Sequence, residues 1–111
     1  MKNRRLFYSA VFAGLAASML ASAGARAEGD AKAGQVKSIP CMGCHAIPGY
    51  SNVYPTYHVP RVGGQHPEYI VAALKAYKTK QRSHPTMQAQ AASLSEEDMN
   101  DIAAFFSSKH E

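Results

Sequence analysis

The chain has 111 residues and only two cysteines, a length that allows one domain. Its formal net charge of +4 comes from the amino-terminal end, because four of the twelve Lys and Arg residues lie before position 28. Residues 28–111 hold eight basic and eight acidic side chains and are therefore neutral, which excludes nucleic-acid binding through a basic surface.

Residues 1–27 have the three parts of a secretory signal peptide. These parts are the basic residues Lys2, Arg4 and Arg5, the apolar run 6–20, and the cleavage sequence Ala25-Arg26-Ala27. An uncleaved membrane anchor is the alternative, but much of the run is Ala, Ser and Gly, whereas a spanning helix needs about 20 strongly apolar residues. We expect cleavage, export to the periplasm, and a mature domain of residues 28–111 with no membrane span.

The first element of that domain is a predicted helix over residues 31–37. Asp30 is a good N-cap, and Pro40 marks the end of the pattern. Gly34 lies inside this helix, where it destabilises by about 1 kcal/mol relative to Ala if exposed. It could instead permit close contact with another helix, and the pattern leaves both interpretations open.

The two cysteines follow in a C-x-x-C-H motif, which is the attachment signature of a covalently bound haem. The motif reads Cys41-Met42-Gly43-Cys44-His45. Two thiols at this spacing lie on one helical turn and can each form a thioether to a haem vinyl group. The adjacent imidazole can then bind the iron. The sequence therefore predicts one covalent haem c held by Cys41 and Cys44, with His45 as the proximal iron ligand.

Two other interpretations of the cysteine pair are weaker. A thioredoxin-like dithiol needs a βαβ context, and nothing downstream reads as buried strands. Half a zinc site needs two further ligands at short spacing, and the remaining histidines are too far apart. Those histidines are His58, His66, His84 and His110.

Residues 46–64 are predicted to form a loop, because Pro and Gly interrupt them too often for a regular element. Tyr50, Tyr54 and Tyr57 lie here. They either cover apolar surface with their hydroxyls in water, or one of them bonds a haem propionate. We also expect a carbonyl within residues 54–60 to accept the Nδ1–H of His45, the contact that orients such a ligand.

Two further helices are predicted, over residues 67–82 and from Ser95 onward. Pro67 suits the first turn of the first helix, whose apolar face recurs at three- and four-residue steps. Its basic residues form a stripe that is either a solvated face or a docking surface for an acidic partner. Ser95 and Asp98 resemble a capping box for the last helix, in which Met99 is expected to be core.

Residues 83–94 read as a loop, and Met87 within them is the predicted sixth iron ligand. An irregular segment lets its side chain point inward, and thioether ligation raises the reduction potential of the iron relative to two imidazoles. Met42 lies inside the attachment turn. His58 and His84 could ligate in principle, whereas His66 and His110 look like exposed residues at helix ends.

Taken in order, these residues resemble a small class I c-type cytochrome of the bacterial c-553 kind, the unit that is repeated in dihaem members. The resemblance covers residues 28–111. It rests on Gly29-Asp30, Ala33-Gly34, Cys41-x-x-Cys44-His45, Pro60-x-Val62-x-Gly64-Gln65, Tyr69, Leu74, Tyr77, Arg82, Met87, Leu94-Ser95-Glu96-Glu97-Asp98 and Ala103-x-Phe105-Phe106.

The resemblance implies an all-α class I cytochrome c fold, with three to four helices around one covalent haem and with His45 and Met87 as axial ligands. Three features depart from the family pattern. Ala46 stands where a glycine is usual, the loop up to Pro60 is longer than typical, and Lys80 occupies a position that is often glycine.

The predicted function is electron transfer rather than enzymatic catalysis, because the sequence contains no Ser/His/Asp or paired-carboxylate arrangement that would indicate a catalytic site. The expected partners are periplasmic or membrane-bound oxidases, reductases or dehydrogenases. Two alternatives remain at this stage. The chain could be the cytochrome subunit of a larger periplasmic dehydrogenase or oxidase, or a haem protein with an open sixth site.

Overall fold

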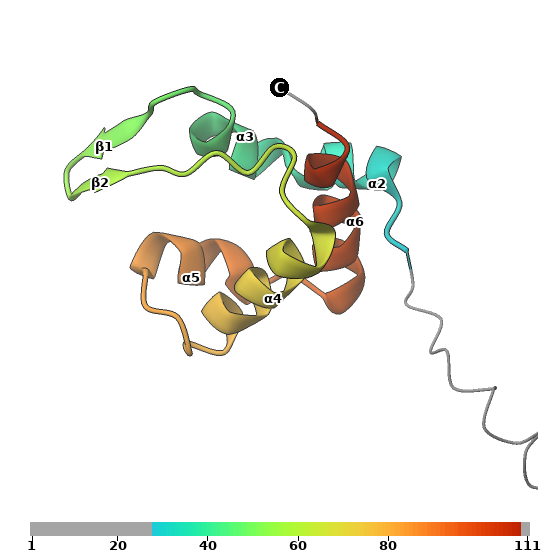
Figure 1. Ribbon diagram of the computed structural model, residues 1–111. Helices are drawn as coiled ribbons and strands as arrows, with labels where there is room; N and C mark the ends of the chain where they lie inside the picture. The colour runs from blue at the N-terminus through green and yellow to red at the C-terminus, as the bar shows by residue number, and fades with distance from the viewer. Residues whose placement is uncertain (1–27, 110–111) are drawn as a thin grey trace, which may run out of the picture.

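The computed structural model describes residues 28–109, so the predicted signal peptide and His110 lie outside the described residues (Figure 1). The described elements are the helices α2 (Ala31–Lys37), α3 (Ile39–His45), α4 (Pro67–Lys78), α5 (Pro85–Ala92) and α6 (Glu96–Ser107), with the short strands β1 (Ser51–Val53) and β2 (Thr56–His58). The expected helical class is correct. The described helices outnumber the three to four predicted, because the attachment turn and the segment around Met87 are themselves helical.

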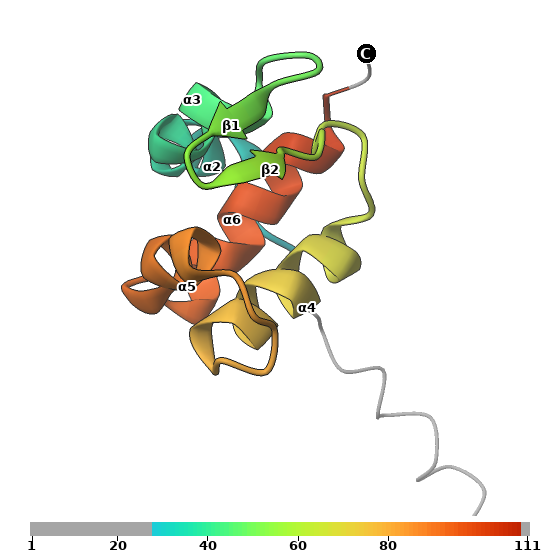
Figure 2. The ribbon, with the colours of Figure 1, turned by 90° about the vertical axis from the view of Figure 1, so that its left-hand side faces the viewer.

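The first and last described helices, α2 and α6, lie side by side and pack against each other (Figure 2). Asp30 caps α2 by accepting hydrogen bonds from the backbone N–H groups of Lys32 and Ala33. Gly34 is buried against α6, and a Cβ atom there would lie 1.9 Å from the Asp101 carbonyl oxygen. The close-contact interpretation of Gly34 is therefore confirmed.

A charged cluster, formed by Lys37, Asp98 and Asp101, stabilises the contact between α2 and α6. The Lys37 ammonium lies 2.9 Å from an Asp98 carboxylate oxygen and 2.7 Å from one of Asp101. The other Asp101 oxygen accepts a 2.7 Å hydrogen bond from the Asp30 backbone N–H. Asp101 is only 5% exposed, and a buried carboxylate is tolerated when it is paired in this way.

The apolar core lies where α4 packs against both α6 and α5. Its buried residues are Ile70, Leu74, Ala91, Met99, Ile102, Ala103, Phe105 and Phe106. Met99 is a core residue, as predicted, and the capping box of Ser95 and Asp98 is present. Two cations of the basic stripe on α4 bind the start of α6, since Lys75 pairs with Glu96 and Lys78 donates to the Leu94 carbonyl.

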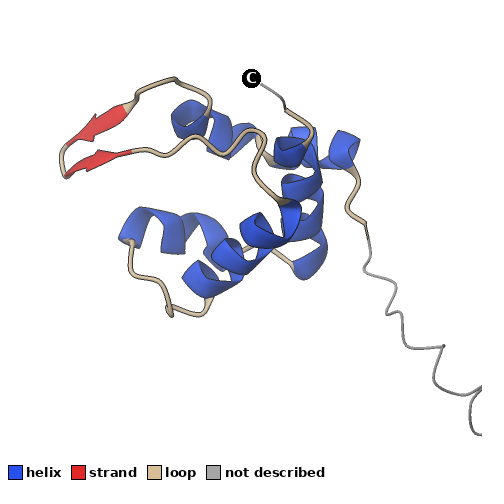
Figure 3. Cartoon of the chain, viewed as in Figure 1, coloured by secondary structure: helices blue, strands red, loops and turns tan. Residues whose placement is uncertain are grey.

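Three local predictions were wrong (Figure 3). Residues 46–64 contain an antiparallel hairpin in which Asn52 pairs with Tyr57. The helix predicted over 67–82 ends at Lys78, because Lys80 takes a left-handed conformation with φ of 61° at the position where glycine is usual. Residues 85–92 form α5, with Pro85 in its first turn.

No helix within residues 28–109 is both long and apolar enough to cross a membrane.

The Gly34 contact predicts a loss of stability in Gly34→Ala. The added methyl group would overlap the α6 backbone, and overpacking of this kind destabilises by about 1–3 kcal/mol. Urea unfolding measures the change. Gly43→Ala is the control, because a Cβ at Gly43 meets no atom within 4 Å and glycine is a poorer helix residue than alanine. An unchanged midpoint in Gly34→Ala would contradict the close packing.

The charged cluster predicts a loss of stability in acid. Hydrogen bonding to Lys37 lowers the pKa of Asp98 to about 2, and it also lowers the pKa of Asp101. Because these folded-state pKa values lie below the unfolded value of about 3.9, their contribution is complete above about pH 4 and is lost as the pH falls toward 2.

We therefore expect Lys37→Met to be less stable than the parent at pH 7, and the gap to narrow at pH 3. The free energy of urea unfolding at both pH values measures this. Lys32→Met is the matched control, because Lys32 is an exposed lysine of the same helix. A stability gap of the same size at both pH values would contradict the assignment.

Candidate functional site

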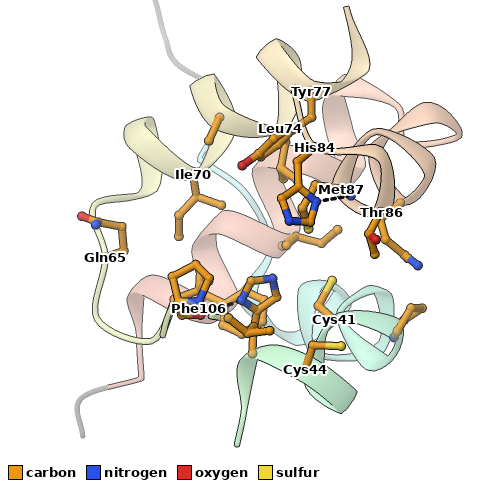
Figure 4. Close-up of a pocket in the computed structure, with 18 of the residues that line it drawn as sticks. Cys41, Cys44, Gln65, Ile70, Leu74, Tyr77, His84, Thr86, Met87 and Phe106 are labelled. Atoms are coloured by element: carbon orange, nitrogen blue, oxygen red, sulfur yellow. Dashed lines mark hydrogen bonds between the residues drawn. The ribbon is translucent and has the colours of Figure 1, made fainter. Parts of the chain in front are cut away.

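An apolar cavity of about 570 Å³ opens between two walls of the molecule (Figure 4). One wall is α3 with residues 57–62, and the other is built from α4, α5 and α6. The predicted residues Cys41, Cys44, His45 and Met87 all line it. The structure thus brings the complete predicted set to one cavity, although Met87 is distant from the motif in the sequence.

The short helix α3 places both thiols on the cavity side. Cys41 and Cys44 are one helical turn apart, and the turn is started by hydrogen bonds from the Cys41 and Met42 N–H groups to the Ser38 carbonyl. Both thiols are free and partly buried. Burial raises the pKa of the Cys41 thiol, which keeps it neutral at pH 7.

His45 is oriented by the loop that follows the motif. Its Nδ1 lies 2.7 Å from the Pro60 carbonyl oxygen. Since a carbonyl only accepts, Nδ1 donates its proton and Nε2 keeps the lone pair that a metal needs. The predicted carbonyl contact is therefore confirmed, and Pro60 is the residue that supplies it. The Val59 N–H bonds the Tyr50 carbonyl and holds the preceding chain in place.

Met87 lies in the first turn of α5 rather than in an irregular segment. It is half-buried and lines the cavity (Figure 4). A helical backbone changes the expected reason for its orientation. The residue points inward because α5 packs along α4 with Ala91 buried, not because the chain is irregular there.

Sequence reasoning missed the contacts around His84. This residue caps α5, and its Nδ1 accepts a 3.4 Å hydrogen bond from the Met87 N–H. Its ring packs edge-on to Tyr57 at a centroid distance of 4.7 Å, and the Tyr57 hydroxyl lies 3.3 Å from the Thr86 hydroxyl. The only available signal was the proline after His84, which often marks the first turn of a helix.

The competing interpretations of the cysteine pair find no support in the described residues. Within residues 28–109, no group of three or more His, Cys, Asp and Glu side chains could hold a metal ion, so a zinc site has no donor set there. The strands of that range form one two-stranded antiparallel hairpin, which is not the βαβ unit of a thioredoxin-like protein.

Comparison with known proteins defines the class. The family description "Cytochrome c" matches residues 31–109, and the chain belongs to this family. Members bind haem c covalently and carry electrons rather than catalyse reactions, so the predicted cofactor, iron and non-enzymatic class are correct.

Individual relatives give the same class. The chain is 39% identical over 84 residues to cytochrome c-554(548) of Halomonas halodenitrificans, covering 73% of this chain and 98% of the relative. It is 36% identical over 85 residues to cytochrome c4 of Pseudomonas aeruginosa, covering 77% of this chain but only 41% of the relative. It is also 33% identical to the cytochrome subunit of sulfide dehydrogenase of Chlorobaculum tepidum, covering 66% of this chain and 63% of the relative.

The solved structure of reduced cytochrome c4 from Pseudomonas stutzeri superposes with a TM-score of 0.57 at 26% identity. The match covers 72% of this chain and 48% of that chain, so this chain spans about half the length of the cytochromes c4 that it resembles. The all-α class I cytochrome c fold is thereby confirmed.

The positions of the thiols predict which residues retain the cofactor. We expect the double variant Cys41→Ala/Cys44→Ala to lose haem under denaturing conditions, because no other cysteine exists to form a thioether. Haem staining after denaturing electrophoresis measures retention. Ser38→Ala is the control, since Ser38 is buried on the same segment and carries no thiol. Haem that stays with the double variant would contradict the assignment.

Proposed function

We propose that this chain is a periplasmic electron-transfer protein with one haem c, bound through Cys41 and Cys44 and ligated axially by His45 and Met87. One observation carries the proposal. The two thiols, an imidazole with a free Nε2 and a thioether line a single apolar cavity from two facing walls (Figure 4).

The cavity suits the group in size and chemistry. Its volume of about 570 Å³ falls within the range of cofactor pockets. Its walls are largely apolar, with buried Ile70, Leu74 and Phe106 available to contact a flat macrocycle. Proteins with haem c attach the macrocycle through two cysteine thiols and bind its iron through an imidazole and a thioether, and these four groups are all present here. The residues present therefore fit the group.

Each residue has a distinct task in electron transfer. Haem iron supplies the one-electron chemistry by alternating between Fe(II) and Fe(III). Cys41 and Cys44 hold the group to α3, and the Pro60 carbonyl fixes the orientation of His45. A methionine thioether is a soft ligand that favours Fe(II) and raises the reduction potential. If His45 and Met87 both bound the iron, no coordination position would remain open for a substrate.

The proposed compartment and partners follow from the amino-terminal sequence and the class. The signal-like residues 1–27 support export to the periplasm and a mature domain of residues 28–111. Suitable partners are periplasmic or membrane-bound oxidases, reductases or dehydrogenases. The net charge of residues 28–111 is zero, so it does not set the sign of the charge on the partner surface.

A second candidate function is that of a cytochrome subunit within a dehydrogenase or oxidase complex. The hairpin favours it, because Val53 is 85% exposed and Tyr54 is 94% exposed at its tip. No charged residue occurs between positions 46 and 60. Stable co-purification with a catalytic partner supports this second function, whereas recovery of the protein alone supports the free carrier.

Met87→Ala tests the proposed sixth ligand. We expect the oxidised parent protein to show the weak far-red charge-transfer band of thioether-to-iron ligation, and the variant to lose it. The reduction potential should fall by roughly 0.1 V or more, because the thioether raises the potential and axial ligands tune it over about 0.8 V. Optical spectroscopy and redox titration of the exported protein measure both.

Met42→Leu is the matched control. Met42 is partly exposed in the attachment helix, so its replacement should leave the band and the potential unchanged. If the band is absent from the parent protein while haem is covalently bound, the sixth ligand is a histidine or is missing. Carbon monoxide binding to the reduced protein then separates these two outcomes.

A further inference from the structure

A side-chain contact joins the hairpin to the helix that carries Met87. The Tyr57 hydroxyl, from β2, lies 3.3 Å from the Thr86 hydroxyl of α5. The Tyr57 ring also packs edge-on to the His84 imidazole at 4.7 Å. All three residues line the cavity together with Met87 (Figure 4). The contact therefore connects the two walls of the cavity: the wall formed by α3 and residues 57–62, and the wall that carries the Met87 thioether.

His84 contacts both Tyr57 and the backbone of Met87. Its Nδ1 accepts a hydrogen bond from the Met87 N–H, so the imidazole is the acceptor that starts α5. Tyr77 lies on a second side of the ring at a centroid distance of 6.4 Å, and the Arg82 guanidinium stacks over Tyr77 at 4.8 Å. The imidazole is thus held by Tyr57 from one wall and by Tyr77 from the other.

Apart from packing of Met87 against the core, the first half of α5 is held by a few polar contacts. α5 has eight residues, and Ala91 is its buried member. A helix this short is not stable alone, so its position depends on tertiary contacts. Ala91 packs the second half into the core. The first half, which carries Met87, is held by the His84 cap, by the hydroxyl pair of Thr86 with Tyr57, and by the Gln88 amide, which donates to the Arg82 carbonyl.

We propose that Tyr57 and His84 are positioning residues for the sixth ligand. They act through the α5 N-cap and the hydroxyl pair with Thr86, and they hold the Met87 thioether in the cavity against displacement. This inference rests on the proposed function, in which Met87 ligates the iron. Neither residue is a ligand in this proposal. Because the His84 Nδ1 accepts from the Met87 N–H, the neutral ring carries its proton on Nε2, which then has no lone pair for iron. The Tyr57 hydroxyl lies against the Thr86 hydroxyl.

Exogenous imidazole is the probe that tests the proposal. It competes with the thioether for ferric iron, so its affinity reports how firmly Met87 is held. We expect His84→Ala to bind imidazole about fivefold more tightly than the parent, equivalent to about 1 kcal/mol. The far-red band should weaken. His84→Asn should recover most of the loss, because an asparagine side chain also accepts at an N-cap.

The hydroxyl pair has its own set of variants. Tyr57→Phe and Thr86→Val each remove one partner and keep the shape of the side chain. We expect each to raise imidazole affinity by about twofold, and the double variant to add nothing, because both remove the same bond. Tyr54→Phe is the matched control, since this tyrosine is in the same hairpin but is 94% exposed. Its imidazole affinity should equal that of the parent.

The outcomes separate this inference from the proposed function. If Met87→Ala loses the band while His84→Ala and Tyr57→Phe keep the parent's band and imidazole affinity, Met87 is the ligand and the positioning role is wrong. If the parent has no band, the proposed ligation itself fails. If His84→Ala proves unfolded in thermal denaturation, His84→Asn and Tyr57→Phe decide the question, because both retain the shape or the cap that folding needs.

Discussion

The whole arrangement depends on the crossing of α2 over α6. Gly34 lets the two backbones meet, and the buried Asp101 binds both the Asp30 N–H and the Lys37 ammonium. Because α3 continues directly from α2 at Ser38, this crossing also fixes the position of the attachment helix relative to the core. A domain of this size buries a low fraction of its surface, so one well-defined crossing has a large effect on where the remaining elements lie.

The two sides of the cavity are assembled by different means. Cys41, Cys44 and His45 are local in sequence, and a single helical turn presents them together. The Met87 side depends on contacts between elements, namely the packing of α5 on the preceding helix α4 and the contact of the more distant hairpin with His84. We therefore expect attachment of the cofactor to be insensitive to most changes elsewhere, and the binding of the proposed sixth ligand, Met87, to respond to changes in the hairpin and in the first turn of α5.

Sequence reasoning succeeded where chemistry is encoded in a short motif. The C-x-x-C-H turn, the capping box of Ser95 and the core position of Met99 each follow from a few adjacent residues or from helical spacing. It failed where tertiary contacts decide. Residues 85–92 contain no strong apolar stripe, so only packing of Ala91 and the cap by His84 make them helical. For Gly34, sequence left two interpretations open, because the neighbour that selects between them lies 67 residues further along the chain.

Two of the three expected departures from the family pattern, Ala46 and the longer loop up to Pro60, lie on the hairpin side of the cavity. The extended loop 46–60 forms a hairpin whose tip exposes Val53 and Tyr54, while Tyr57 at its base contacts α5. One insertion thus links an exposed apolar tip to the residues around Met87. A partner that binds the tip would act on the same segment that positions the sixth ligand. Such a contact can change how firmly the proposed thioether ligand is held if it moves Tyr57 relative to His84 or Thr86, since these contacts join the hairpin to the first turn of α5.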